Sequence, residues 1–242
     1  MISEGDRVIL VGHNREYYLR AGHGKFGSDA GEIQLADLIG KMPGEQVQTH
    51  LGKPFTIRLP RPPDLFSHGK RSGAPMLPKD IGMVIAYTGM NRNDTVLDAG
   101  TGSGIAAIYF GGIAAAVDTY EVRSEFARLA EKNIADAHLE NVTVHAADVL
   151  TASGVYDIVH LDMMITEEHT EHAHSLLVPG GFFVAYTPFL EQTFVVFDSC
   201  ADLFAGRVHC FECIERELTR SSRGTRPSTR VAHSGFLTVA RK

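Results

Sequence analysis

The sequence contains no tryptophan, only three cysteines and no long apolar run. Three cysteines (Cys200, Cys210 and Cys213) are too few for the disulfide framework of a small secreted domain. A membrane-spanning helix needs about 20 consecutive apolar residues, and no run in this chain approaches that length. Residues 1–6 lack the basic and apolar character of a secretory signal. These absences predict a cytoplasmic protein.

The chain also lacks net positive charge, since its formal charge is −6. The charge is unevenly distributed, however. In residues 53–79 and 214–242 basic side chains outnumber acidic ones, whereas in residues 80–213 acidic side chains outnumber basic ones. Because phosphate contacts need only a local basic patch, the chain could bind a nucleic acid despite its negative net charge. The alternative is that these are scattered surface charges without a common function.

Two groups of residues contain side chains that can bind metals, but neither group forms a complete metal site. Cys210 and Cys213 are three residues apart, but zinc needs about four ligands and no second cysteine pair exists. Their alternation with apolar residues favours a buried strand. Three histidines spread around a polar helix predicted near residues 167–174, which favours a solvated face. These are His169, His172 and His174. We therefore predict no bound metal.

The first 70 residues differ from the rest of the chain in the pattern of their apolar residues. With 242 residues, 44% of them hydrophobic, the chain has room for one α/β domain and a small appendage. Residues 1–70 contain short apolar runs bounded by glycines and turns, which predicts a small N-terminal β-barrel-like or sandwich domain. Three prolines at positions 60, 62 and 63 predict an irregular linker over residues 59–72. Residues 71–242 form the second predicted domain.

In the second domain, strand-like and helix-like segments alternate. This pattern predicts an α/β fold, namely a seven-stranded Rossmann-like sheet that is mostly parallel, with its last strand antiparallel and helices on both faces. The strands are predicted at residues 95–97, 114–120, 142–145, 156–161, 181–186, 208–214 and 235–240.

A glycine-rich turn joins the first of these strands to a helix. Residues 98–104 read Asp-Ala-Gly-Thr-Gly-Ser-Gly, and such a strand-to-helix turn lets a nucleotide-like ligand approach the backbone closely. A dinucleotide fingerprint requires its third glycine where Ile105 stands, so the match to NAD-binding proteins is poor.

Carboxylates follow the next two predicted strands. Glu121 follows the second predicted strand and is well placed to accept hydrogen bonds from ribose hydroxyls, and Asp148 follows the third. Together with the glycine turn, this pattern resembles motif I of class I methyltransferases dependent on S-adenosylmethionine (SAM). The resemblance implies that Asp148 contacts the adenine amino group of the cofactor. The alternative is an ordinary α/β domain in which these residues serve only the turns.

The resemblance implies SAM as cofactor, S-adenosylhomocysteine (SAH) as product and residues 71–242 as the catalytic domain. The candidate cofactor residues are Leu77, Asp98, Gly100, Thr101, Gly102, Ser103, Gly104, Glu121, Val122, Asp148, Val149 and Asp162.

The end of the fourth predicted strand bears on the methyl acceptor. Methyltransferases of this class that act on exocyclic amines typically carry an Asn/Asp-Pro-Pro-Tyr-like sequence there, whereas this chain reads Leu-Asp-Met-Met at residues 161–164. A single aspartate, Asp162, suits an acceptor whose methylated product needs a carboxylate partner, such as a purine ring nitrogen.

At this point the chain resembles the tRNA (adenine-N1)-methyltransferases that modify adenosine 58 of the T-loop. The resemblance covers nearly the whole length and includes the N-terminal β domain. Its motifs are Pro78-Lys79-Asp80, the glycine turn, Tyr120-Glu121, Asp148-Val149, Leu161-Asp162-Met163, Tyr186-Thr187-Pro188 with Gln192, Arg226-Pro227 and His233-Ser234-Gly235-Phe236-Leu237.

The resemblance implies roles for individual residues. Asp162 accepts a hydrogen bond from the adenine 6-amino group, orients N1 and stabilises the charge on the methylated ring. Tyr186 lines the base pocket. The residues implied to bind tRNA are Arg220, Arg223, Arg226, Arg230 and His233. The family also implies a homotetramer, and its archaeal members act on position 57 as well.

Two positions depart from the family pattern. Leu77 stands where tyrosine or histidine often precedes Pro-Lys-Asp, and Met164 stands where proline is common. Two other function classes remain open: a methyltransferase of the same fold that acts on a protein or small molecule, and a non-catalytic RNA-binding subunit. The intact glycine turn with Glu121, Asp148 and Asp162 disfavours the latter.

Overall fold

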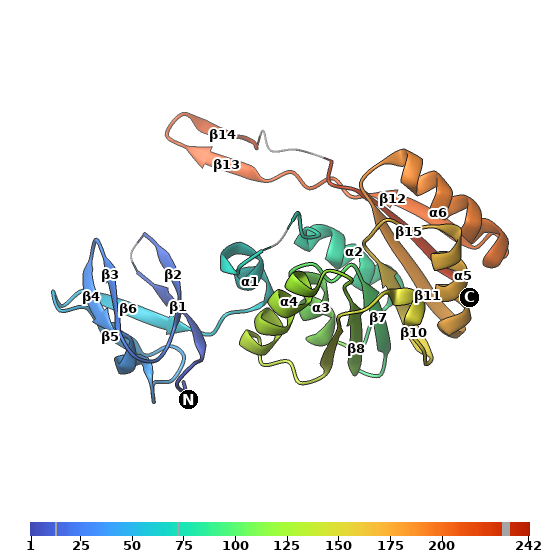
Figure 1. The fold of residues 1–242 in the computed structure, drawn as a ribbon. Coiled ribbons are helices and arrows are strands. Elements are labelled where there is room, and N and C mark those ends of the chain that lie inside the picture. Colours follow the sequence, from blue (N-terminus) through green and yellow to red (C-terminus); the bar gives the residue numbers. More distant parts are fainter. Residues whose placement is uncertain (13, 72, 229–232) are drawn as a thin grey trace. The chain divides into compact units, whose positions relative to one another are not determined.

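The computed structural model describes residues 1–12, 14–71, 73–228 and 233–242 (Figure 1). The chain divides into two compact units. The first comprises Met1–Lys70 with Ala135–His138, and the second comprises Arg71–Ile134 with Leu139–Lys242. No helix among the described residues is long and apolar enough to cross a membrane.

The first unit is built from short antiparallel strands. Four of them form a sheet in the order β2-β1-β6-β5, and β3 pairs with β4. The elements are β1 (Arg7–Val11), β2 (Glu16–Arg20), β3 (Lys25–Ser28), β4 (Gly31–Gln34), η1 (Leu35–Leu38), β5 (Gln46–Gln48) and β6 (Pro54–Arg58). Alternate residues such as Val8, Leu10 and Ile57 are fully buried and form its core. The sequence did not indicate β3, because that strand has one large apolar residue and a glycine.

The predicted linker over residues 59–72 contains a helix, so that expectation was wrong. Helix α1 spans Pro62–His68. Prolines are tolerated in the first turn of a helix, where the missing N–H would have had no partner within the helix. The Asp64 carboxylate accepts a hydrogen bond from the Arg61 N–H at 2.8 Å and caps the turn. The prolines therefore begin this helix.

The second unit contains the predicted seven-stranded sheet, in the order β12-β15-β11-β10-β7-β8-β9. Only β15 runs antiparallel to its neighbours. The strands are β7 (Thr95–Ala99), β8 (Ala116–Tyr120), β9 (Val142–His145), β10 (Tyr156–Leu161), β11 (Leu177–Thr187), β12 (Val208–Glu212) and β15 (Phe236–Arg241). Central strands β7 and β10 are almost entirely buried, which explains their continuous apolar runs.

Helices cover both faces of this sheet. Figure 1 shows α5 and α6 together on one side and α2, α3 and α4 on the other. The helices are α2 (Pro78–Thr88), α3 (Ile105–Gly111), α4 (Ser124–Asp136), η2 (Val149–Thr151), α5 (Glu167–Leu176) and α6 (Leu190–Leu203). The sequence-based prediction of an α/β sheet with an antiparallel last strand is confirmed.

A two-stranded hairpin between β12 and β15 was not predicted. It consists of β13 (Leu218–Ser221) and β14 (Gly224–Pro227), and all of its residues are exposed. Figure 1 shows the hairpin extending away from the seven-stranded sheet. Its sequence lacks the apolar alternation that identifies a half-buried strand, so the sequence pattern did not predict these two strands.

Two expectations about cysteine and histidine need correction. Cys210 is exposed because β12 is an edge strand of the sheet, and Cys213 follows the end of β12 and is half-buried. The histidines of α5 are half-buried instead of forming a fully solvated face. The His174 ring packs edge-on against Phe204, and burial lowers the pKa of His174. Among the described residues, no group of three or more potential metal ligands converges.

Candidate active site

The carboxyl ends of neighbouring parallel strands bring the predicted site residues together. Ala99 at the end of β7 pairs with Tyr120 of β8 and Leu161 of β10. The residues that come next in the chain are Gly100, Glu121 and Asp162. This edge of a parallel sheet is where α/β proteins usually bind their ligands.

The glycine turn passes directly over the backbone of Asp162. Gly100 has a φ of +85°, and a Cβ atom on it would lie 1.9 Å from the Asp162 carbonyl oxygen. The Asp162 N–H in turn donates to the Ala99 carbonyl at 2.8 Å. Only glycine allows this backbone conformation and approach together, so the turn lies in direct contact with the Asp162 backbone.

Side chains from α4 and β8 form hydrogen bonds to the glycine turn. Asn133 donates from Nδ2 to the Ser103 carbonyl at 2.8 Å, and the Thr101 and Thr119 hydroxyls are 2.6 Å apart. The Ser103 hydroxyl oxygen is buried and has no hydrogen-bond partner in the described part of the chain. An unpaired buried hydroxyl is unusual in a folded protein, and it fits a site that takes a ligand with a hydrogen-bonding group.

Asp98 points into the sheet and does not face the open edge. Its two carboxylate oxygens accept hydrogen bonds from the Thr119 hydroxyl at 2.6 Å and from His160 Nδ1 at 2.7 Å. Both donors are cross-strand neighbours of Asp98, and His160 is completely buried. This geometry gives Asp98 a part in holding β7, β8 and β10 in register beneath the turn.

Two hollows flank Gly100 and Asp162. The larger, of about 470 Å³, is lined by residues that include Gly100, Glu121, Val122, Asp148, Val149 and Asp162. The smaller, of about 180 Å³, lies between residues 73–76 and the glycine turn and includes Thr101, Gly102 and Ser103. The structure thus brings most predicted cofactor residues together. Leu77, Asp98 and Gly104 line neither hollow.

Glu121 is held as a carboxylate. It accepts hydrogen bonds from the Gly102 N–H at 2.9 Å and from Arg123 Nε at 2.8 Å. Burial alone would raise the pKa of Glu121, but the hydrogen bonds from Arg123 and Gly102 outweigh it and lower the pKa. The sequence pattern did not predict a role for Arg123, although its position two residues after Glu121 was an available signal.

The lining of the larger hollow also combines an exposed apolar surface with a second carboxylate. Val122 is 67% exposed although it is a large apolar residue. Asp148 caps η2, where its Oδ1 accepts from the Leu150 N–H at 2.9 Å. An apolar surface beside a carboxylate suits a planar heterocycle with an amino group.

Asp162 has the most perturbed carboxyl group of the site. Burial raises its pKa to about 6; His160 opposes this rise, while Asp98 and Asp80 add to it. Such a shift in a hollow is typical of a functional residue.

The pKa of Asp162 predicts a pH-dependent stability. The folded chain binds this proton more tightly than the unfolded chain, so lowering the pH from about 7 to about 4 should stabilise the wild type relative to Asp162→Asn by about 1 to 3 kcal/mol. The advantage is full below the unfolded pKa and disappears as the pH rises through about 6. Urea denaturation of both proteins at several pH values measures it. A difference that does not change with pH would contradict the raised pKa.

Tyr186 lies near the end of β11, on the strand beside β10, after which Asp162 follows. Leu161 pairs with Ala185, so Asp162 and Tyr186 each follow one member of this pair. Tyr186 is 8% exposed, and its hydroxyl donates to Asp80 Oδ2 at 3.3 Å. Burial raises the pKa of Tyr186 well above its ordinary value, so the phenol is neutral.

The predicted RNA-binding residues occupy two places. Arg220, Arg223 and Arg226 lie on the exposed β13–β14 hairpin, and within the described residues none of them forms an ion pair. Arg230 lies outside the described residues. His233 contacts the Pro188 carbonyl at 3.0 Å and Glu212 at 2.7 Å, and these contacts raise the pKa of His233.

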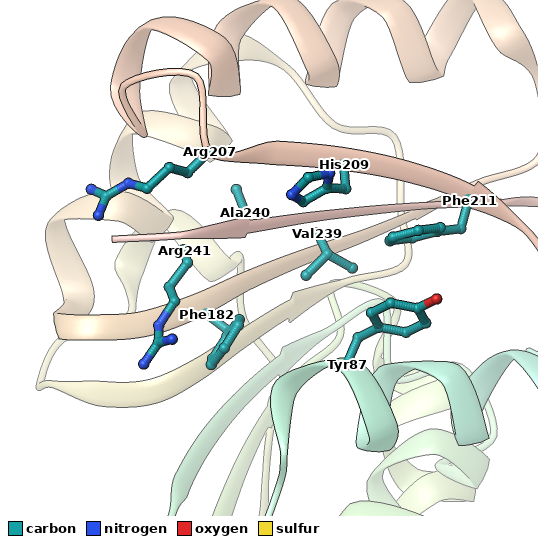
Figure 2. A pocket seen from close by; sticks show the side chains of 8 residues that line it. All are labelled: Tyr87, Phe182, Arg207, His209, Phe211, Val239, Ala240 and Arg241. Atoms are coloured by element: carbon teal, nitrogen blue, oxygen red, sulfur yellow. The ribbon is translucent and has the colours of Figure 1, made fainter.

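A third hollow, of about 500 Å³, lies on the β11-β15-β12 part of the sheet (Figure 2). The rings of Tyr87 and Phe211 stack at 4.3 Å, and the two arginines lie at the opposite end (Figure 2). It is lined by Tyr87, Phe182, Arg207, His209, Phe211, Val239, Ala240 and Arg241. Its lining contains no carboxylate, which favours a role in packing over a role in catalysis.

Comparisons with known proteins give the family. Residues 69–199 match the family model described as protein-L-isoaspartate(D-aspartate) O-methyltransferase (PCMT). The chain is 30% identical, over 97% of its length and 94% of the relative, to the tRNA (adenine(57)-N(1)/adenine(58)-N(1))-methyltransferase TrmI of Methanocaldococcus jannaschii.

Solved structures agree with this placement. A SAM-dependent O-methyltransferase from Thermotoga maritima aligns over 100% of this chain and 94% of its own, with a TM-score of 0.86 and 27% identity. TrmI from Aquifex aeolicus aligns over 100% and 98%, with a TM-score of 0.80 and 23% identity, which supports the fold. Residues 69–199 thus match the PCMT family, and the chain as a whole belongs to the TrmI family of tRNA (adenine-N1)-methyltransferases.

Proposed function

We propose that this chain transfers a methyl group from SAM to N1 of an adenine in the T-loop of tRNA, at position 58, with position 57 as a second candidate. The observation that carries the proposal is the placement of Asp162 directly against the glycine turn and beside Tyr186. The relative from M. jannaschii, which matches nearly the whole chain, is named for both positions. Residues 71–242 would form the catalytic domain.

The residues around the two hollows fit SAM. The buried hydroxyl of Ser103, which has no partner in the described chain, the carboxylate of Glu121 and the exposed surface of Val122 offer a hydrogen-bonding group, a ribose acceptor and an apolar contact. Asp148 would accept from the adenine amino group. When bound, SAM supplies an electrophilic methyl group on a sulfonium, and SAH remains. Ribose binding would exchange or share the hydrogen bonds that Arg123 now makes to Glu121.

The substrate adenine must leave its stacked position in the tRNA before its N1 can enter the site. Asp162, as a carboxylate, accepts from the 6-amino group and fixes the direction of the N1 lone pair, because in-line attack depends on alignment. The same carboxylate stabilises the positive charge that develops on the methylated ring. Tyr186 contacts the base from the next strand.

Transfer of labelled methyl from SAM to unmodified tRNA, followed by nucleoside mass spectrometry, tests the proposal. We expect N1-methyladenosine, and sequencing of the modified tRNA distinguishes positions 57 and 58. The second candidate function is methyl transfer to a protein or small molecule, which the PCMT match and the O-methyltransferase neighbour favour. Label found only on protein or small molecules would support it instead, and no transfer would leave a non-catalytic subunit.

The arginine hairpin is proposed to hold the tRNA backbone. Changing Arg220, Arg223 and Arg226 to alanine should weaken tRNA binding and make the slope of log K against log salt shallower by about 2 to 3, because about three phosphate contacts are lost. Fluorescence titrations at several salt concentrations measure this slope. The affinity for SAH should stay unchanged.

A matched control removes three exposed basic residues that are not on the hairpin. Arg92, Arg128 and Lys132 have the same total charge and lie outside the proposed RNA surface. Their change to alanine should leave the slope nearly unaltered. Equal slopes for the two triple variants would contradict a specific role of the hairpin.

The family resemblance also leads us to propose a homotetramer that acts in the cytoplasm, where tRNA is available. The aromatic hollow beside β12 supports self-association, since Phe182, Phe211 and Tyr87 present apolar surface there (Figure 2). Light scattering of the purified chain gives the mass directly. A monomer at micromolar concentration would overturn the assembly proposal and leave the catalytic one intact.

A further inference from the structure

A buried ion pair lies behind Tyr186. Lys79 and Asp80 open α2, and their side chains are only 9% and 3% exposed, with Nζ 2.6 Å from Oδ1. Lys79 Nζ also donates to the Ser234 hydroxyl and to the Cys213 carbonyl, each at 2.6 Å. All three protons of the ammonium group are therefore used, as a buried charge requires.

The second oxygen of Asp80 receives two hydroxyl groups. The Ser234 hydroxyl donates to Oδ2 at 2.8 Å, and the Tyr186 hydroxyl donates to it at 3.3 Å. Asp80 Oδ2 can only accept, so in this contact the phenolic hydrogen of Tyr186 points toward Asp80. The Ser234 side chain also hydrogen-bonds the phenol.

The ring of Tyr186 is also fixed in place. A Cβ atom on Gly235 would lie 2.4 Å from Tyr186 Cζ and 2.7 Å from its hydroxyl oxygen, so the ring packs directly on the Gly235 backbone. The ring is therefore packed against the Gly235 backbone, and its hydroxyl hydrogen is engaged by Asp80. What the phenol offers to any further partner is its oxygen lone pairs.

We propose that Asp80, oriented by Lys79 and Ser234, is a positioning residue that makes the Tyr186 oxygen a hydrogen-bond acceptor for the 6-amino group of the target adenine; this rests on the proposed function. The 6-amino group carries two hydrogens, so Asp162 and Tyr186 can each accept one. An adenine is thereby favoured over bases that present an acceptor at this position, because two acceptors would face each other.

The substitution Asp80→Asn tests the direction of this hydrogen bond. The ammonium group of Lys79 requires an acceptor, so it should hold the amide oxygen and leave the amide NH₂ facing Tyr186. The amide would then donate to the phenol oxygen and occupy it. We expect kcat for methyl transfer to fall about tenfold, the size of one hydrogen bond. The affinity for SAH should not change.

A double-mutant cycle with Tyr186→Phe distinguishes an effect of Asp80 on the Tyr186 hydroxyl from a general effect of Asp80 on the structure. Because Asp80 acts through the Tyr186 hydroxyl, Asp80→Asn should cause no further loss of kcat in the Tyr186→Phe background. Additive losses would overturn the inference. A wild type that forms no N1-methyladenosine would refute the proposed function itself, so the two failures are distinguishable.

A second pair of variants covers the case in which Asp80→Asn does not fold. Lys79→Met combined with Asp80→Asn contains no buried charge, and its amide is free to turn its oxygen toward Tyr186. Lys79→Met combined with Asp80→Leu offers no acceptor at all. We expect near wild-type kcat from the first and the same roughly tenfold loss from the second. Equal kcat values for the two would contradict the positioning role.

Discussion

Replacing Asp162 with alanine should lower kcat for methyl transfer by about 100- to 1000-fold, or about 3 to 4 kcal/mol, the scale of losing one preorganised electrostatic partner. The carboxylate has two tasks in the proposed reaction: it directs N1 toward the methyl group and balances the charge of the product ring. Water that replaces it cannot be held in the same geometry. Single-turnover transfer to unmodified tRNA, with quantification of N1-methyladenosine, measures the loss.

The affinity for SAH serves as the internal control for this variant. The glycine turn contacts the backbone of Asp162, through its carbonyl oxygen and its N–H, and alanine keeps both. Calorimetry should therefore show SAH binding close to that of the wild type. Asp162→Asn retains an acceptor oxygen without the charge, so its rate should lie between the two. An unchanged kcat for Asp162→Ala would remove this residue from the mechanism.

The sequence predicted those parts of the site that depend on local spacing. The glycine turn, Glu121 and Asp148 each follow a strand with a clear apolar pattern, and parallel strands end at one edge of a sheet. The position of Asp98 in the same motif indicated a cofactor contact. The strand register instead pairs Asp98 with Thr119 and His160, whose hydrogen bonds draw its carboxylate into the sheet.

Local sequence patterns do not predict interactions between segments that are far apart in the chain. Asp80 and Ser234 are separated by 154 positions, and only the folded sheet brings them together with Tyr186. The sequence showed Pro-Lys-Asp as part of a resemblance but gave no physical reason for its charges. The β13–β14 hairpin escaped for another reason, because exposed strands need no apolar alternation.

The same distinction between local and tertiary information bears on Gly100. Its motif indicates a glycine, but only the structure shows what a side chain there would meet. In Gly100→Ala, the new Cβ would overlap the Asp162 carbonyl at 1.9 Å, and the φ of +85° would add strain. We expect the free energy of unfolding to fall by about 2 to 4 kcal/mol, from left-handed backbone strain together with overpacking. SAH binding should become undetectable, because the turn must move away from Asp162.

Gly82→Ala is the matched control for this prediction. Gly82 is exposed on α2, and a Cβ there would meet nothing within 4 Å. The change should stabilise the chain by about 0.5 to 1 kcal/mol, since alanine favours a helix interior, and should leave SAH affinity unaltered. Chemical denaturation and calorimetry on both variants separate the two effects. If Gly100→Ala bound SAH as the wild type does, the close approach of the turn to Asp162 would not define the binding site. The proposed alignment of cofactor and base at Asp162 would then lose its structural basis.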